Sequence, residues 1–192
     1  MTRLPSLRWT YALLTIGAGV VAGPAGSADN NTLEYAVKAN FLYKFGDYVG
    51  WPPEVLGPPD TPAVICVVGA DPFGRLLDDA VSGERIGEHP IAVRRLDAVT
   101  PESGCHILYV RDAQGQRTAE ALKAVAGKPV LTITDVPDGQ GSVGIINFVL
   151  RQNRVRFEID EQTAVMSRLD ISSKLLGLAV SVRARENRGS GQ

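Results

Sequence analysis

The stretch AVICVVGADPF, residues 63–73, decides the fold class of this chain. Residues 63–68 form a short, almost entirely apolar run, which is typical of a strand buried on both faces of a sheet. The next two residues turn the chain, and Asp71 followed by Pro72 indicates a helix N-cap and the first helical residue. We therefore predict a buried strand that leads directly into a short helix over 73–80.

The same alternation of strand and helix continues toward the C-terminus. Strands are predicted over 91–96, 106–110 and 130–134, and a helix over 117–126 precedes the last of them. Alternating strands and helices indicate an α/β fold whose sheet is mostly parallel and flanked by helices. No repeat or linker interrupts the pattern, so we expect a single compact domain.

The two ends of this domain depart from the alternation. Strands over 144–150 and 154–159 follow one another closely and predict a hairpin near the C-terminus. A final helix is predicted to begin at Asp170, since apolar residues recur after it at core spacing, namely Ile171, Leu175, Leu178 and Val182. An N-terminal helix is predicted over 33–49, before Trp51-Pro52-Pro53, with a wide buried face made of Tyr35, Val37, Ala39, Phe41, Leu42, Phe45 and Tyr48.

Composition excludes several classes of protein. Of 192 residues, 44% are apolar and 21% are charged, which is a core-forming balance and not that of a disordered tail, a coiled coil or a collagen-like repeat. The formal charge is −1, with 20 Lys and Arg against 21 Asp and Glu. No net positive field is present to attract nucleic acid, so we expect no nucleic-acid partner.

The first 28 residues match a secretory signal peptide. Arg3 and Arg8 precede a short apolar run, and small residues follow over 23–28. Cleavage after Ala28 fits this pattern best, with cleavage after Ala25 as the alternative. The apolar run is shorter than the roughly 20 residues that a membrane span needs. We expect an exported chain with a domain over 29–182, a flexible tail over 183–192, and a charge of −3 once both arginines are removed.

Export changes the meaning of the two cysteines. In an oxidising compartment, Cys66 and Cys105 are expected to form a structural disulfide. Closing a loop of about 40 residues would stabilise the fold by roughly 4 kcal/mol on a chain-entropy argument. Two buried free thiols are the alternative.

Patterns that would indicate an active site are weak. Residues 139–144 match GxGxxG, but a predicted strand and not a helix follows them, so we interpret them as a turn. Asp71, Asp112 and Asp135 each follow a predicted strand and together could hold Mg²⁺ at the edge of the sheet. A helix cap and two turns account for these acids more simply.

The few histidines and cysteines give no better candidate. Their spacing matches no zinc motif, and His106 is expected to be a packed, hydrogen-bonded residue and not a ligand or a base. We therefore predict no catalytic residue, no metal site and no cofactor, and a protein that is not an enzyme.

Six segments in order carry a resemblance to a known family. They are VKANFLYKF (37–45) leading to Trp51-Pro52, ICVVGADPFG (65–74), CHILYV (105–110), PVLTITD (129–135), VRFEI (155–159) and SSKLL (172–176). Taken together, this set resembles the YfiR-like family of bacterial periplasmic proteins. The resemblance extends over nearly the whole predicted domain.

This resemblance implies a compact α/β fold, a periplasmic location and no catalytic activity. It also implies a partner, the periplasmic portion of an inner-membrane diguanylate cyclase, which the family represses, thereby lowering cyclic di-GMP and biofilm formation. Cys66 and Cys105 match a cysteine pair of the family. A second family pair is missing, because Gly141 and Ser142 stand in that region, so redox control through a second bond is not implied for this chain.

Two surfaces are candidates for binding a partner or ligand. The first is the aromatic end of the N-terminal helix, with Tyr43, Tyr48 and Trp51, because aromatic residues dominate interface energetics. Burial in the core is the alternative, especially for Trp51 and Phe45. The second is a polar set made of Arg156, Glu158, Arg168, Ser172, Ser173 and Lys174. Arg156 and Glu158 are two residues apart on a predicted strand and therefore share one face. The two serines and Lys174 lie in the first turn of the predicted last helix, where backbone N–H groups favour an anionic group.

Two further hypotheses for function stay open. The chain could be a sensor module that binds a small anionic or aromatic ligand and acts on a membrane kinase or other receptor. It could also be a periplasmic enzyme that uses the acids at the strand ends. A homodimer remains open as well, since isologous dimers are common.

Overall fold

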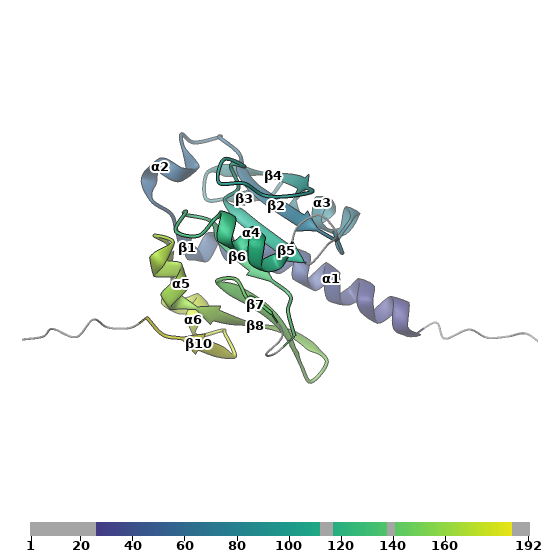
Figure 1. Ribbon diagram of the computed structural model, residues 1–192. Helices are drawn as coiled ribbons and strands as arrows, with labels where there is room; N and C mark the ends of the chain where they lie inside the picture. Colours follow the sequence, from purple (N-terminus) through teal and green to yellow (C-terminus); the bar gives the residue numbers. More distant parts are fainter. Residues whose placement is uncertain (1–25, 112–116, 138–140, 186–192) are drawn as a thin grey trace, which may run out of the picture.

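The computed structural model describes residues 26–111, 117–137 and 141–185 (Figure 1). The predicted signal peptide lies outside the described residues except for its last three, which begin the first helix. Most of the predicted tail, from residue 186, also lies outside them. In the part of the chain that is described, no helix is long and apolar enough to cross a membrane.

The described residues form an α/β fold around one eight-stranded sheet and a small two-stranded one. Neighbouring strands are parallel from β7 through β6, β5 and β2 to β4, whereas β8 is antiparallel to β7. The predicted mostly parallel sheet with a C-terminal hairpin is therefore confirmed. In sheet order the strands are β10 (Ser181–Arg183), β8 (Arg154–Asp160), β7 (Ile146–Arg151), β6 (Leu131–Thr134), β5 (Ile107–Arg111), β2 (Ala63–Gly69), β4 (His89–Leu96) and β3 (Arg85–Ile86).

Helices cover both faces of the sheet, because alternate residues of its central strands are apolar on both sides. Ile65 and Val67 of β2 belong to a large core beneath α1 and α3, whereas Cys66 and Val68 belong to a second core beneath α4. The helices are α1 (Gly26–Lys44), the 3₁₀ helix η1 (Phe45–Tyr48), α2 (Pro53–Leu56), α3 (Arg75–Val81), α4 (Thr118–Ala124), α5 (Glu161–Met166) and α6 (Ser173–Leu176).

Helix α1 differs from its prediction in which residues it buries. The predicted face included Val37, which is 37% exposed, and it omitted Lys38, which is 1% exposed. The helix also ends at Lys44, and the chain tightens into η1 before β1 (Val49–Gly50) pairs with β9 (Asp170–Ile171). The apolar stripe read from the sequence is wider than the part of α1 that the sheet covers.

The predicted long C-terminal helix is wrong. Asp170 lies in β9 and caps no helix, and the hydroxyl of Ser172 instead caps the single turn α6 by accepting a hydrogen bond from the N–H of Leu175 at 3.3 Å. Leu178 is 60% exposed and Val182 lies in β10. The helical spacing fails here because pairing of β10 with the edge of β8 overrides the local pattern.

Asp71 caps a turn and not the helix that follows. Its carboxylate accepts hydrogen bonds from the N–H groups of Phe73 at 2.8 Å and Gly74 at 3.2 Å, and α3 begins only at Arg75. The predicted helix start at residue 73 is therefore two residues early. An Asx turn of this kind uses the same side chain that an N-cap would use, which is why the sequence pattern does not separate them.

The predicted disulfide is confirmed. Cys66 in the middle of β2 is bonded to Cys105, and their Cα atoms lie 5.7 Å apart. Next to it, Nδ1 of His106 accepts a hydrogen bond from the N–H of Val64 at 2.8 Å, and Nε2 lies 3.1 Å from the carbonyl oxygen of Val55. Burial lowers the pKa of His106. Both ring nitrogens are used by the backbone, so His106 is the packed residue that we predicted.

Candidate functional site

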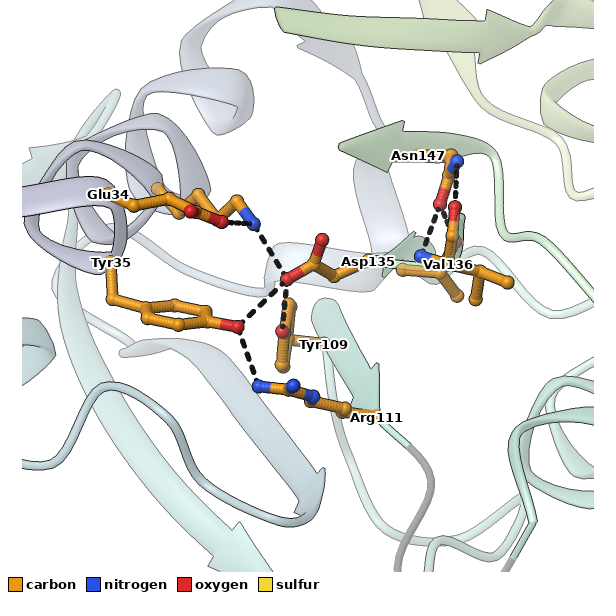
Figure 2. Close-up of polar contacts among 9 residues, drawn as sticks. Glu34, Tyr35, Tyr109, Arg111, Asp135, Val136 and Asn147 are labelled. Atoms are coloured by element: carbon orange, nitrogen blue, oxygen red, sulfur yellow. Dashed lines mark hydrogen bonds and ion pairs between the residues drawn. The ribbon is translucent and has the colours of Figure 1, made fainter. Parts of the chain in front are cut away.

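Asp135, directly after β6, is the centre of a partly buried polar cluster (Figure 2). Its Oδ2 atom accepts hydrogen bonds from Nζ of Lys38 at 2.7 Å, from the hydroxyl of Tyr35 at 3.3 Å and from the hydroxyl of Tyr109 at 3.4 Å. Nζ of Lys38 also forms an ion pair with Glu34, one helical turn earlier on α1. The cluster thus joins the helix to the carboxyl ends of β5 and β6.

The ammonium group of Lys38 is buried because two carboxylates compensate it. Its side chain is 2% exposed, compared with 16% for Asp135 and 22% for Glu34. An isolated buried charge is costly, so a lysine inside a core requires such partners. Sequence reasoning missed Lys38, although Glu34 and Lys38 have the i,i+4 spacing of a helical ion pair.

The two tyrosines are held protonated. Burial raises the pKa of Tyr35 to about 12, and the nearby negative charge of Asp135 adds to the shift. Burial, together with Asp135, also raises the pKa of Tyr109. Both phenols therefore remain hydrogen-bond donors to the carboxylate at neutral pH.

Arg111, at the end of β5, connects the cluster to the surface. One guanidinium N–H donates a hydrogen bond to the hydroxyl of Tyr35 at 2.6 Å, and the guanidinium carbon lies 5.6 Å from the centre of that ring. The rest of this exposed side chain faces a pocket of about 730 Å³, a size typical of small-ligand sites. The pocket is lined by Glu34, Tyr35, Arg111, Thr118, Asp135, Val136, Pro137, Gly141, Phe148, Val149, Leu150 and Arg151.

Asn147 positions the segment that follows Asp135. Its side-chain oxygen accepts hydrogen bonds from the N–H of Val136 at 3.0 Å and from the hydroxyl of Thr134 at 2.9 Å, and its amide nitrogen donates to the carbonyl of Val136 at 3.0 Å. Asn147, inside an apolar strand, is thus hydrogen-bonded to the side chain of Thr134 and to both backbone groups of Val136. These hydrogen bonds tie Val136, directly after Asp135, to strand β7.

The glycines of the GxGxxG match, as far as they are described, have structural roles. A Cβ atom on Gly144 would lie 2.6 Å from the carbonyl oxygen of Thr132, so only glycine allows the segment before β7 to approach β6 this closely. Gly141 has a φ of 86°. Strand β7 follows at Ile146, which agrees with the interpretation of this segment as a turn and not a phosphate loop; residue 139 lies outside the described residues.

The two described acids at strand ends, Asp71 and Asp135, are engaged by different cations. Oδ2 of Asp71 lies 2.7 Å from Nε of Arg95, whose pKa is raised by hydrogen bonds to Asp78 and Asp71. Asp135 is compensated by Lys38, and Asp112 lies outside the described residues. Among the residues that the structure describes, no group of three or more His, Cys, Asp and Glu could hold a metal ion. The magnesium hypothesis therefore gains no support.

The predicted aromatic surface is partly buried. Tyr43 is 5% exposed and packs in the core. Trp51 is half-buried, and its Nε1 atom is enclosed without a hydrogen-bond partner in the described part of the chain. Nζ of Lys174 lies 5.5 Å from the centre of the ring of Tyr48. The surface that remains combines Tyr48 with part of the predicted polar set.

That polar set divides into two groups. Arg156 and Glu158 share one face of β8, and Glu158 forms an ion pair with Arg151 at 3.4 Å. The second group lies around η1 and α2, since Arg168 approaches Glu54 at 3.6 Å and the N–H of Ser172 donates to the carbonyl of Tyr48 at 2.9 Å. Ser173 and Lys174 are exposed in this group, on a helix of a single turn.

Comparison with known proteins adds one finding. A family model described as YfiR/HmsC-like matches residues 35–180, which include all of the sheet except β10. A search of curated proteins finds no significant match.

Proposed function

This chain belongs to the YfiR/HmsC-like family, and from that premise we propose that it binds the periplasmic part of an inner-membrane diguanylate cyclase and represses it. Repression would lower cyclic di-GMP and biofilm formation. The family consists of periplasmic regulators that act with a membrane protein partner. The observation that carries the proposal is the length of the match, because residues 35–180 take in both cores and, apart from Glu34, the cluster around Asp135.

Two structural features support a regulatory protein of the periplasm, the first by its bearing on catalysis and the second by its bearing on location. The described acids at the strand ends are engaged in ion pairs, with Lys38 for Asp135 and with Arg95 for Asp71, so neither is poised as a base or a metal ligand. The disulfide between Cys66 and Cys105 suits an oxidising compartment such as the periplasm.

The direct test is the concentration of cyclic di-GMP in cells that lack this chain. We expect it to rise on deletion and to return to its starting value when a copy with its signal peptide is restored. A copy without residues 1–28 is the matched control, because it would stay in the cytoplasm and leave the concentration high. Unchanged cyclic di-GMP after deletion would contradict repression of a cyclase.

A small-molecule sensor is the second candidate, and the pocket beside Arg111 favours it. The pocket of about 730 Å³ is lined by the exposed guanidinium of Arg111, which suits a small anionic ligand. Thermal unfolding of the purified domain with a panel of such metabolites tests this reading. A stabilising ligand whose effect disappears in Arg111→Ala, but persists in Arg75→Ala on the surface of α3, would support it.

A further inference from the structure

Helix α1 carries a row of apolar side chains that the sheet does not cover. Leu33 is 66% exposed and Val37 is 37% exposed, whereas Phe41 is partly buried and its ring lies 5.8 Å from that of Phe157. These residues have i,i+4 spacing, so they form one line along the helix. In Figure 1 the N-terminal end of α1 extends beyond the sheet, on the side toward which the β7–β8 hairpin projects.

A groove of about 680 Å³ separates this row from the hairpin. On the hairpin side its wall includes Leu150, which is 48% exposed, and the half-buried Val155. Its floor at Phe41 is firm, because that ring packs against Phe45 as well as Phe157. Exposed large apolar side chains that line one groove are uncommon on a protein surface without a partner.

The rim of the groove is positively charged. Arg154 and Arg156 line it and are exposed, and neither has an ion-pair partner among the described residues. The acid on the opposite rim, Glu34, is already paired with Lys38. After removal of residues 1–28 the chain has a net charge of −3, so the rim of the groove is positive although the protein as a whole is negative.

We propose that this groove docks an acidic amphipathic segment of the extracytoplasmic part of the membrane partner. The proposal rests on the proposed function, and it names the surface and the chemistry of its target. Apolar side chains of that segment would cover Leu33, Val37 and Leu150, and its carboxylates would meet Arg154 and Arg156.

Charge argues against the other occupants of the groove. A second copy bound isologously would bring the arginines of two grooves toward each other. The predicted signal peptide contains Arg3 and Arg8 and no acid, so it has the wrong sign as well. An acidic partner segment is the occupant that matches both the apolar wall and the rim.

A second set of exposed apolar side chains lies outside the groove and provides the control positions. Its members are Val165, Met166, Leu178, Val180 and Val182. The arginines beside it are matched within the chain, because Arg183 approaches Asp160 at 3.3 Å and Arg185 approaches Glu161 at 3.6 Å. Leu178, at 60% exposed, resembles Leu33, at 66% exposed, in apolar character and does not line the groove.

Photo-crosslinking in cells tests the groove. The full chain would carry p-benzoylphenylalanine at position 33 or, as the matched control, at position 178. We expect position 33 to crosslink to a membrane protein, on a segment that combines apolar and acidic residues, and position 178 to give no such product. Crosslinks from position 33 only to copies of this chain or to lipid, or no protein crosslink at all, would overturn the assignment.

Charge reversal gives a second, independent measurement. Arg154→Glu combined with Arg156→Glu should abolish the position-33 crosslink and weaken binding of the partner segment by about tenfold or more, whereas Arg75→Glu should change neither. All three residues are exposed, and unchanged thermal unfolding would confirm that the variants fold. Binding that survives the double reversal would contradict the role of the rim.

The two proposals can fail separately. If deletion raises cyclic di-GMP and the double reversal represses it as well as the natural chain does, the proposed function stands and the groove assignment falls. If deletion leaves cyclic di-GMP unchanged while position 33 still crosslinks to an acidic segment of another membrane protein, the groove assignment stands and repression of a cyclase falls.

Discussion

The two sides of helix α1 differ, because one buries a charged side chain and the other exposes apolar ones. On the side facing the sheet, Lys38 is buried because Asp135 and Glu34 compensate its charge. On the side facing the hairpin, Leu33 and Val37 are apolar and yet exposed, because no element of the described fold covers them. Burial along this helix therefore follows the presence of a partner in the fold and not the polarity of the side chain.

The cluster and the groove also differ in what they leave open to another molecule. At the cluster, the carboxylate of Asp135 already accepts three hydrogen bonds, which suits a structural role. At the groove, Arg154 and Arg156 have no ion-pair partner among the described residues. Glu34 and Leu150 line both the pocket beside the cluster and the groove, so the two regions share one wall.

The largest expected effect comes from breaking the cluster. Asp135→Ala should lower the free energy of unfolding by about 3 kcal/mol, since the buried ammonium group of Lys38 would keep only Glu34 as a partner. Urea unfolding of the purified domain measures this change. The combination Lys38→Met with Asp135→Leu is the control, because it removes both charges and should recover much of the lost stability. A double variant less stable than Asp135→Ala would show that the ion pair itself drives folding.

A smaller effect is expected from the ionisation of Tyr35. In the unfolded chain its phenol ionises near pH 10, whereas in the fold burial raises its pKa to about 12. The contribution of Tyr35 to the free energy of unfolding is complete below about pH 10. It is lost as the pH rises toward 12, at a rate of roughly 1 kcal/mol per pH unit. Urea unfolding at about pH 9.5 and about pH 11 measures the loss. Tyr35→Phe should weaken the dependence of the free energy of unfolding on pH. An equal pH dependence in the natural chain and in Tyr35→Phe would contradict the role of Tyr35.

The smallest effect on stability is expected at the groove. Val37→Ala should change the free energy of unfolding by less than about 0.5 kcal/mol, because an exposed side chain loses little on truncation. Leu42→Ala, on the buried side of the same helix, should cost about 2 kcal/mol or more. Thermal or urea unfolding distinguishes the two. A comparable loss at both positions would erase the contrast between the two sides of α1.

Much of the fold was predictable because strand and helix signals are local. The apolar run at 63–68 and the short strands after it form β2, β5 and β6 as expected, and the hairpin forms β7 and β8. The last helix was mispredicted because residues 170–182 have helical spacing, while β10 pairs with β8 through contacts that no local pattern records.

For the candidate site, the sequence indicated individual residues but not which of them are in contact. Asp135 is predicted as an acid at the end of a strand, but that pattern does not name its partners. The ion pair of Lys38 with Asp135 joins residues 97 positions apart. Lys38, between apolar neighbours on a helix, would ordinarily be assigned to solvent.

The sequence by itself determined the α/β class, the positions of the main strands along the chain and the expected cysteine pair, because these depend on periodicity, turn residues and composition. Tertiary structure alone decided that Lys38 is buried and that Leu33 and Val37 are exposed. Both outcomes depend on where the sheet ends beneath α1, which is a property of long-range packing. The uncovered groove with its two arginines is the consequence, and it is where we expect the partner to bind.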